Sequence, residues 1–226
     1  MIMDRKLLIL GDIHGGFNGL CNKLQNINDA LIIQIGDFGI GFNSAAKDLR
    51  ALELVNNICR KNNIELKAFR GNHDDPAYFA ESNWIQPNIE LLADYSYLEF
   101  AGKEILCVGG ATSIDRIDRI EGRSWWPEEG FELRENLIRP VDILLVHSAP
   151  SWLGPTDKGG IVGFYCEKDE DLWEELKRER AWIDRLFDLA KPKFSFSGHF
   201  HRYETNNKDG CVARILDCDQ FFHLEI

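Results

Sequence analysis

Short apolar runs that end in polar turns recur along the first third of the chain. Residues 6–10, 31–35 and 64–69 form runs that are too short for a core helix, so each predicts a buried strand. Between these runs, apolar residues recur at helical spacing over 20–27 and 44–62. Strands that alternate with helices predict a parallel sheet with right-handed crossovers, whose polar turns gather at the carboxyl ends of the strands.

The pattern changes after residue 89. Residues 95–100 and 104–108 predict two antiparallel strands joined by a tight turn. Residues 112–139 show no clear period, which indicates a long ordered loop or a short helix with flanking loops. The remaining predictions are buried strands at 141–146 and 193–197, a long amphipathic helix at 172–190, and a closing hairpin made of 211–216 and 221–225. Periodicity alone therefore predicts an α/β chain with antiparallel additions.

Composition and charge limit the classes of function. With 226 residues, 44% of them hydrophobic, the chain can bury a sizeable core as a single domain over residues 1–226. The first apolar run, 7–10, is far shorter than a secretion signal or membrane span, so we expect a soluble cytoplasmic protein with no membrane partner. The formal net charge of −11 argues against binding extended duplex nucleic acid but allows a small anionic substrate held at a metal. The six cysteines include no C-x-x-C pair, and we expect them to be reduced and structural.

Candidate chemistry lies in the turns that follow the predicted strands. Eight polar residues stand there, and they include five of the six histidines: Asp12, His14, Asp37, Asn72, His73, His147, His199 and His201. A lone histidine after a strand is more often a hydrogen-bonded core residue than a metal ligand. That explanation fits poorly here, because five histidines occupy such positions beside two Gly-Asp turns and one Gly-Asn turn. Mixed carboxylate, imidazole and amide ligands suit divalent or trivalent Mn, Fe, Zn, Ni or Co, and there are enough of them for two ions.

The order of these motifs resembles a known family. Gly11-Asp12-Ile13-His14-Gly15, Gly36-Asp37, Gly71-Asn72-His73-Asp74, the strand-end His147 and Gly198-His199-Phe200-His201 resemble the five blocks of the calcineurin-like metallophosphoesterases. The resemblance covers almost the whole chain. It implies a four-layer α/β/β/α sandwich, with two mixed β-sheets packed face to face and helices outside, and a two-metal phosphoester hydrolase.

The resemblance also implies a role for each residue. One metal ion would be held by Asp12, His14, Asp37 and His201, and the other by Asp37, Asn72, His147 and His199, so that Asp37 bridges. A water between the ions would lose a proton and attack phosphorus. In the family the histidine at position 73 stands beside the scissile bond, where it can protonate the leaving alkoxide or bind its charged oxygen, with Asp74 holding its ring. Alternatively, Asp74 caps the turn before Pro76.

The sequence departs from the family at one place. Phosphoprotein phosphatases of the family follow this Gly-Asp with Asp-Arg-Gly, whose arginine grips phosphate, whereas this chain reads Gly36-Asp37-Phe38-Gly39. We expect at least one of Arg116, Arg119 and Arg123 to contact substrate instead, the alternative being ordinary surface salt bridges. Arg70 is expected to be structural. The aromatic residues of the long loops either stack on substrate or pin the loops to the sandwich: Trp125, Trp126, Trp152, Phe164 and Tyr165.

Three functions fit these observations. The first is a phosphomonoesterase (phosphatase) acting on phosphorylated small molecules, nucleotides or proteins. The second is a phosphodiesterase for cyclic nucleotides or nucleic acid ends, because the same metals would serve it. The third is a non-catalytic scaffold for protein assembly, which is disfavoured because every ligand position and His73 are filled. The oligomeric state, the substrate and the metals are not specified by these motifs.

Overall fold

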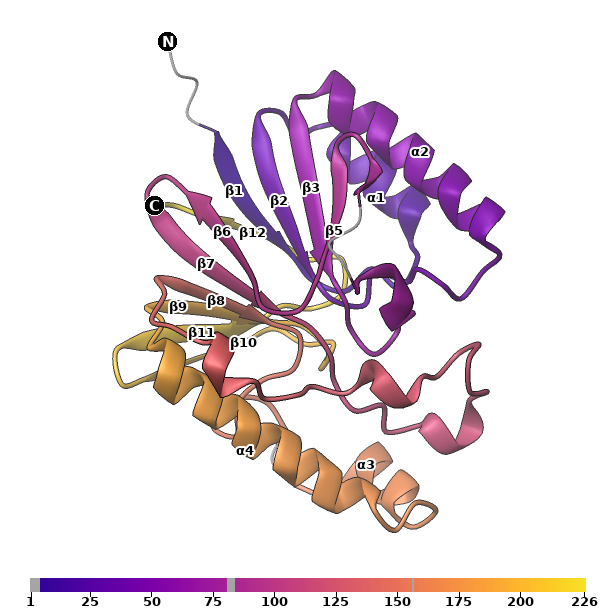
Figure 1. Cartoon of the computed structure of the whole chain (residues 1–226), viewed down its shortest axis with the longest axis vertical. Helices are drawn as coiled ribbons and strands as arrows, with labels where there is room; N and C mark the ends of the chain where they lie inside the picture. The colour runs from indigo at the N-terminus through magenta and orange to yellow at the C-terminus, as the bar shows by residue number, and fades with distance from the viewer. Residues whose placement is uncertain (1–4, 81–83, 156) are drawn as a thin grey trace.

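Two six-stranded sheets form the centre of the protein in the computed structural model, which describes residues 5–80, 84–155 and 157–226 (Figure 1). The first sheet contains, in spatial order, β12 (Phe221–Leu224), β1 (Lys6–Leu10), β2 (Ala30–Ile35), β3 (Ile64–Phe69), β5 (Ile89–Leu92) and β4 (Trp84–Gln86). The second contains β10 (Glu204–Lys208), β11 (Cys211–Ile215), β9 (Phe194–Ser197), β8 (Ile143–Val146), β7 (Lys103–Val108) and β6 (Ser96–Phe100). The α-helices are α1 (Phe17–Leu24), α2 (Ala45–Lys61), α3 (Gly160–Cys166) and α4 (Leu172–Ala190).

Both sheets are parallel at the centre and antiparallel at the edges. Strands β1, β2, β3 and β5 run parallel, while β12 and β4 pair antiparallel at the two ends of the first sheet. In the second sheet β11, β9, β8 and β7 run parallel, and β10 and β6 are the antiparallel edges. The predicted parallel sheet is therefore confirmed, and the turns after β1, β2 and β3 leave it at the same edge.

Alternation along the strands divides the core into layers. In β1, Leu7 and Ile9 pack between the two sheets, whereas Leu8 and Leu10 pack against the cluster that includes α1 and α2. Residues of α4, among them Ile183 and Leu186, cover the outer face of the second sheet. The layers are thus helices, sheet, sheet and helix, which confirms the four-layer sandwich that the family resemblance implied.

The expected C-terminal hairpin is wrong. Strand β11 pairs with β9 and β10 in the second sheet, whereas β12 pairs with β1 in the first. The chain between β11 and β12 crosses from one sheet to the other, and the N–H of Asp219 donates to the Asp12 carbonyl at 2.7 Å on the way. Two apolar runs separated by a short turn indicate two strands, but they do not specify that the strands pair with each other.

Several elements lack a clear sequence signal. The edge strand β10 is polar and largely exposed, β4 and β5 are short, and α3 follows a glycine-rich segment. Residues 112–139 form an ordered loop with short 3-10 turns at Arg116–Asp118, Pro127–Glu129 and Glu135–Leu137, as the absence of a period predicted. All six cysteines are free thiols. Among the described helices, we find no segment with the length and hydropathy of a membrane span.

Candidate metal centre

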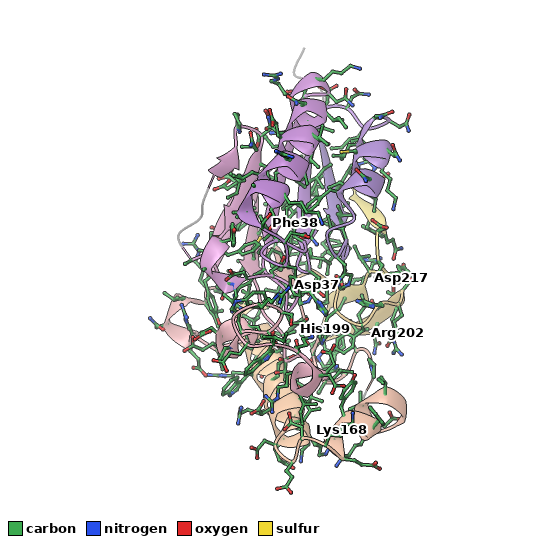
Figure 2. All side chains as sticks on the ribbon, turned by 90° about the vertical axis from the view of Figure 1, so that its right-hand side faces the viewer. Asp37, Phe38, Lys168, His199, Arg202 and Asp217 are labelled. Atoms are coloured by element: carbon green, nitrogen blue, oxygen red, sulfur yellow. The ribbon has the colours of Figure 1, made fainter. Side chains whose placement is uncertain are left out.

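The turns after five parallel strands bring the predicted ligands together. Asp12 and His14 follow β1, Asp37 follows β2, and Asn72 and His73 follow β3, all in the first sheet. The second sheet contributes His147 after β8, and His199 and His201 after β9. Figure 2 shows Asp37 and His199 near each other between the half of the molecule that carries α1 and α2 and the half that carries α3 and α4. The cluster therefore lies where the two sheets meet.

One group of side chains forms around His14 and His201. Their Nε2 atoms lie 2.8 Å apart, and His201 Nε2 is 3.4 Å from Asp12 Oδ2. His14 Nε2 is 3.7 Å from Asp37 Oδ2. Two imidazoles and two carboxylates thus point their ligand atoms at one position.

A second group forms on the other side of Asp37. Asn72 Oδ1 lies 3.2 Å from His147 Nε2 and 2.9 Å from His199 Nδ1. His147 Nε2 is in turn 3.2 Å from Asp37 Oδ1, while His147 Nδ1 lies 2.8 Å from the Ile35 carbonyl. Because the Ile35 carbonyl can only accept, Nδ1 carries a proton, so Nε2 is the ring nitrogen that can offer a lone pair to a cation.

Asp37 lies between the two groups with one carboxylate oxygen facing each. Burial disfavours its charged form, but the neighbouring His147 outweighs burial and holds the pKa of Asp37 well below its ordinary value. Burial would lower the pKa of His147, yet the Asp37 carboxylate raises it to about 9. Asp37 therefore draws positive charge to this position, as a cation site requires.

The backbone is bent into unusual conformations at the same residues. His14, Asp37, His199 and His201 have positive φ values of 45°, 55°, 67° and 47°. Left-handed backbone is unfavourable for residues with a Cβ and collects at functional sites, where surrounding packing maintains it. The turns are therefore shaped to aim these side chains inward.

The donor set fits a pair of metal ions. Asp12 is fully buried, and its Oδ1 has no hydrogen-bond partner in the described part of the chain, which is costly unless a cation balances it. The ligand atoms of Asp12, His14, His201 and Cys218 lie within 4.8 Å of one another, as do those of Asp37, His147 and His199. Cys218 had no role in the sequence analysis, and only the crossing of residues 216–220 between the sheets brings it here.

His73 stands beside this cluster in an aromatic setting. Its ring stacks on Phe42, with centroids 5.8 Å apart and planes at 19°, and Phe42 makes an edge contact with Trp126 at 5.3 Å. The Arg119 guanidinium Nη2 lies 2.6 Å from His73 Nε2, which therefore accepts its hydrogen. Burial, helped by Arg119 and opposed by Asp37, lowers the pKa of His73 to about 4. Phe42 was not among the predicted site residues, because nothing in the turn after Asp37 marks an aromatic as functional.

Asp74 was expected either to hold the His73 ring or to cap the turn before Pro76, but it hydrogen-bonds to other groups. Its Oδ1 accepts the N–H groups of Gly39 and Ile40 at 2.7 and 3.1 Å, and its Oδ2 accepts those of Phe38 and Gly71 at 3.0 and 2.8 Å. The cap is Asp75, which accepts from the Ala77 N–H. Burial and the Asp37 charge raise the pKa of Asp74 to about 7, against the effect of these donors. Asp74 ties the turn after β3 to the turn after β2.

The three candidate arginines have different surroundings. Arg116 pairs with Asp169 at 2.6 Å, in the loop before α4, and with Glu175 of α4. These ion pairs match the alternative of ordinary salt bridges for Arg116. The Arg123 side chain is exposed. Arg119 is the one of the three that reaches the site, where it also pairs with Asp115 at 2.7 Å. Arg70 is structural as expected, because it pairs with Asp94 and donates to carbonyls of the loop at 128–130.

Two buried polar residues support the cluster without a sequence signal. Ser113 Oγ accepts from Asn72 Nδ2 at 3.0 Å and from Arg119 Nη1 at 3.1 Å, which orients the Asn72 amide so that its oxygen faces the histidines. Glu129 Oε1 accepts the Ser113 N–H at 2.9 Å. Burial raises the pKa of Glu129 to about 7. Both residues lie in the segment without a period, where spacing identifies no partner.

The aromatic residues expected in long loops divide between packing and the site, and two of them, Phe164 and Tyr165, lie on α3 instead. Trp126 is buried against Phe42, and Trp152 makes an edge contact with Phe187 of α4 at 5.4 Å, so both pin loops to the sandwich. Tyr165 lines the pocket beside the cluster, whereas Phe164 is 49% exposed and makes an edge contact with it.

A family model described as calcineurin-like phosphoesterase matches residues 5–203. The chain belongs to this family. As a calcineurin-like phosphoesterase it is a hydrolase that acts on phosphoester bonds, and the family implies a dinuclear centre of divalent ions for which the described residues supply candidate ligands. No curated protein matches the sequence significantly.

Two solved structures are similar to this chain at low sequence identity. A proposed 5′-nucleotidase from Staphylococcus aureus is 10% identical with a TM-score of 0.52, and the match covers 95% of this chain and 48% of that one. The phosphopantetheinyl hydrolase of Mycobacterium tuberculosis is 13% identical with a TM-score of 0.49, and the match covers 96% of this chain and 90% of that one. At 10% identity, the likeness to the 5′-nucleotidase extends to the fold alone.

Proposed function

We propose that this phosphoesterase is a phosphomonoesterase with two metal ions, and that Asp37 is shared between them. The observation that carries the proposal is the geometry of Asp37, whose Oδ2 faces His14 at 3.7 Å while its Oδ1 faces His147 at 3.2 Å. A shared carboxylate offsets the repulsion between two cations held about 3.5–4 Å apart. When bound, such a pair supplies a nucleophilic water near neutral pH and neutralises phosphate charge.

The residues of the chain have distinct tasks in this proposal. Asp12, His14 and His201 would hold one ion, with Cys218 as a further candidate ligand, and Asn72, His147 and His199 would hold the other, with Asp37 common to both. Ser113 and the Ile35 carbonyl orient Asn72 and His147, so both ligands are aimed before an ion arrives. The ligands are fixed by packing and hydrogen bonds, which reduces the reorganisation that a substrate would otherwise have to cause.

Arg119 takes the place of the arginine that the turn after Asp37 lacks. Its side chain is 9% exposed, and its guanidinium lies against His73 at the edge of the cluster, where a phosphate oxygen can accept hydrogen bonds from its N–H groups. A phosphomonoester dianion carries one more negative charge than a diester, and Arg119 supplies a cation beyond the metals to match it. His73 stands next to the leaving oxygen, with its ring held by Phe42.

The test compares p-nitrophenyl phosphate with bis(p-nitrophenyl) phosphate in the presence of Mn, Ni, Zn or Mg. Metal-stimulated turnover is expected, with the monoester preferred, and Asp37→Asn should abolish it. Asp29→Asn, a carboxylate before β2 and away from the ligand cluster, is the matched control and should keep full activity. Faster diester turnover would make the enzyme a phosphodiesterase, and metal-independent turnover in Asp37→Asn would overturn the shared-ligand proposal.

Metal binding can be measured separately from turnover. Calorimetric titration of the chelator-treated protein with Mn²⁺ should give two equivalents, and Asp37→Asn should lose at least one of them. Two bound equivalents in Asp37→Asn with wild-type affinity would contradict the assignment of Asp37.

A further inference from the structure

A pocket of about 630 Å³ opens beside the candidate metal centre. Its lining includes Asp37, Asn72, His73 and His199 from the centre, together with residues of α3 and α4. In Figure 1 these two helices lie along one side of the molecule, below the strands of the second sheet. The pocket is within the range of about 300–1,000 Å³ in which drug-sized ligands are bound, and a phosphoryl group alone would fill only a small part of it.

Much of the remaining pocket wall is apolar. It is lined by Ile114, Ile161, Val162, Tyr165, Trp173 and Leu176. Ile161 and Tyr165 are four residues apart on α3, and Trp173 and Leu176 are three apart on α4, so each helix presents one stripe to the pocket. Ile161 is 59% exposed, so its side chain is accessible to a ligand in the pocket.

The charged residues of the same wall have partners within the protein. Lys177 pairs with Glu174 at 2.6 Å, and Arg180 donates to the Leu153 carbonyl at 2.5 Å. Glu179 accepts the N–H and hydroxyl of Thr112. These charged groups are therefore less able to bind a polar ligand, whereas the aromatic and aliphatic side chains of the wall can contact an apolar one.

We infer that the substrate is a small-molecule phosphomonoester whose leaving alcohol carries a bulky, largely apolar group, aromatic or aliphatic, that occupies this pocket between α3 and α4. The inference rests on the proposed function and specifies its substrate class. His73 and Arg119 line the same pocket, so the group inside it is attached to the oxygen that departs. Water adds to phosphorus, the bond from phosphorus to the ester oxygen breaks, and that oxygen leaves as the alcohol with a proton from the water, giving inorganic phosphate.

The kinetic test uses phenyl phosphate and 2-naphthyl phosphate, whose leaving groups have similar acidity but differ by one ring. The added ring should raise kcat/KM by roughly tenfold or more if it is buried against the apolar wall. Ile161→Ser should reduce that preference by about threefold to tenfold. Leu54→Ser is the matched control, because Leu54 is 57% exposed on α2, which does not line the pocket, and it should leave both rates unchanged.

A binding test keeps the inference independent of turnover. Calorimetry with 2-naphthol, the alcohol alone, should show binding to the wild-type protein and to Leu54→Ser, and binding at least threefold weaker to Ile161→Ser. Both variants change exposed side chains, so neither is expected to unfold the protein.

The outcomes separate the two proposals. If neither ester is hydrolysed with any metal but 2-naphthol binds in an Ile161-dependent way, the phosphomonoesterase proposal fails and the apolar site stands as a ligand site. If both esters are hydrolysed with equal kcat/KM and 2-naphthol does not bind, the inference about the leaving group is overturned while the proposed function holds.

Discussion

Replacing Asp74 distinguishes a structural carboxylate from a catalytic one. The carboxylate accepts four hydrogen bonds of 2.7–3.1 Å. The donors are the buried backbone N–H groups of Phe38, Gly39, Ile40 and Gly71. In Asp74→Ala these donors would lose their partner together. A buried donor left unpaired costs about 1–3 kcal/mol, and water entering the vacated space would satisfy some of them, so we expect a loss of about 3–5 kcal/mol in the free energy of unfolding. This is a large part of the total for a typical domain, about 5–15 kcal/mol.

The conservative substitution sharpens the prediction. Asp74→Asn keeps one acceptor oxygen but places an NH₂ group against two N–H donors, so it should still cost about 2–4 kcal/mol. The neighbouring Asp75→Asn is the matched control, because Asp75 accepts one N–H at the start of a short 3-10 turn and should cost about 1 kcal/mol or less. Urea unfolding followed by tryptophan fluorescence gives all three values, with and without metal.

One result would refute this reasoning. If Asp74→Asn unfolds within about 0.5 kcal/mol of the wild type, the carboxylate is not needed to join the two turns. A fall in kcat with unchanged stability would instead return Asp74 to the role of orienting His73.

Three further predictions concern other parts of the site. Arg119→Ala should lower kcat/KM for a phosphomonoester by roughly 100- to 1,000-fold. The control Arg123→Ala removes an exposed arginine of the same loop and should change kcat/KM by less than about twofold. Equal effects of the two substitutions would show that Arg119 does not contact substrate. Glu129→Gln should raise the free energy of unfolding at pH 8 by up to about 2–3 kcal/mol but not at pH 4. The reason is that folding raises the pKa of Glu129 from 4.5 to about 7, so its contribution to stability is present below pH 4.5 and lost as the pH rises to 7; an equal gain at both pH values in urea unfolding would contradict this. Cobalt-loaded protein should show a thiolate-to-cobalt absorption band in the near ultraviolet. The band should disappear in Cys218→Ser and remain in the control Cys21→Ser. A band that persists in Cys218→Ser would place this cysteine outside the metal site.

The strand ends were predictable because burial on both faces leaves a clear signal. Apolar runs such as 31–35 have no polar side to present, and a parallel sheet directs all their turns to one edge. The positions of the ligands follow from this rule together with the motifs. The pairing of the strands at the ends of the chain could not be predicted in this way, because β12 pairs with β1, which is more than two hundred residues away in sequence. Alternation specifies which faces are buried, not which strand is the neighbour.

The choice among the arginines could not be made from the sequence. Arg116 and Arg119 are three residues apart in a segment without a period, and the acids that occupy Arg116 lie 53 and 59 residues further along. Only the packing of α4 against the loop reveals that Arg116 pairs with acids away from the metal centre, whereas Arg119 lies against His73. The roles of Phe42, Ser113 and Glu129 depend in the same manner on contacts between distant segments.

The packing of the two sheets and the assembly of the metal centre depend on the same close contacts. A Cβ on Gly36, after β2, would lie 2.2 Å from His147 Nδ1 of the other sheet, and one on Gly198, after β9, would lie 2.0 Å from Asp12 Oδ1. Each glycine therefore allows a ligand from one sheet to reach across a turn of the other. Left-handed backbone at Asp37 and His199 costs about 1–2 kcal/mol per residue, and a turn in isolation would relax it. The sheets hold these turns in place through the apolar layer between them, so substitutions that loosen this layer, even far from the ligands, should weaken metal binding before they unfold the protein.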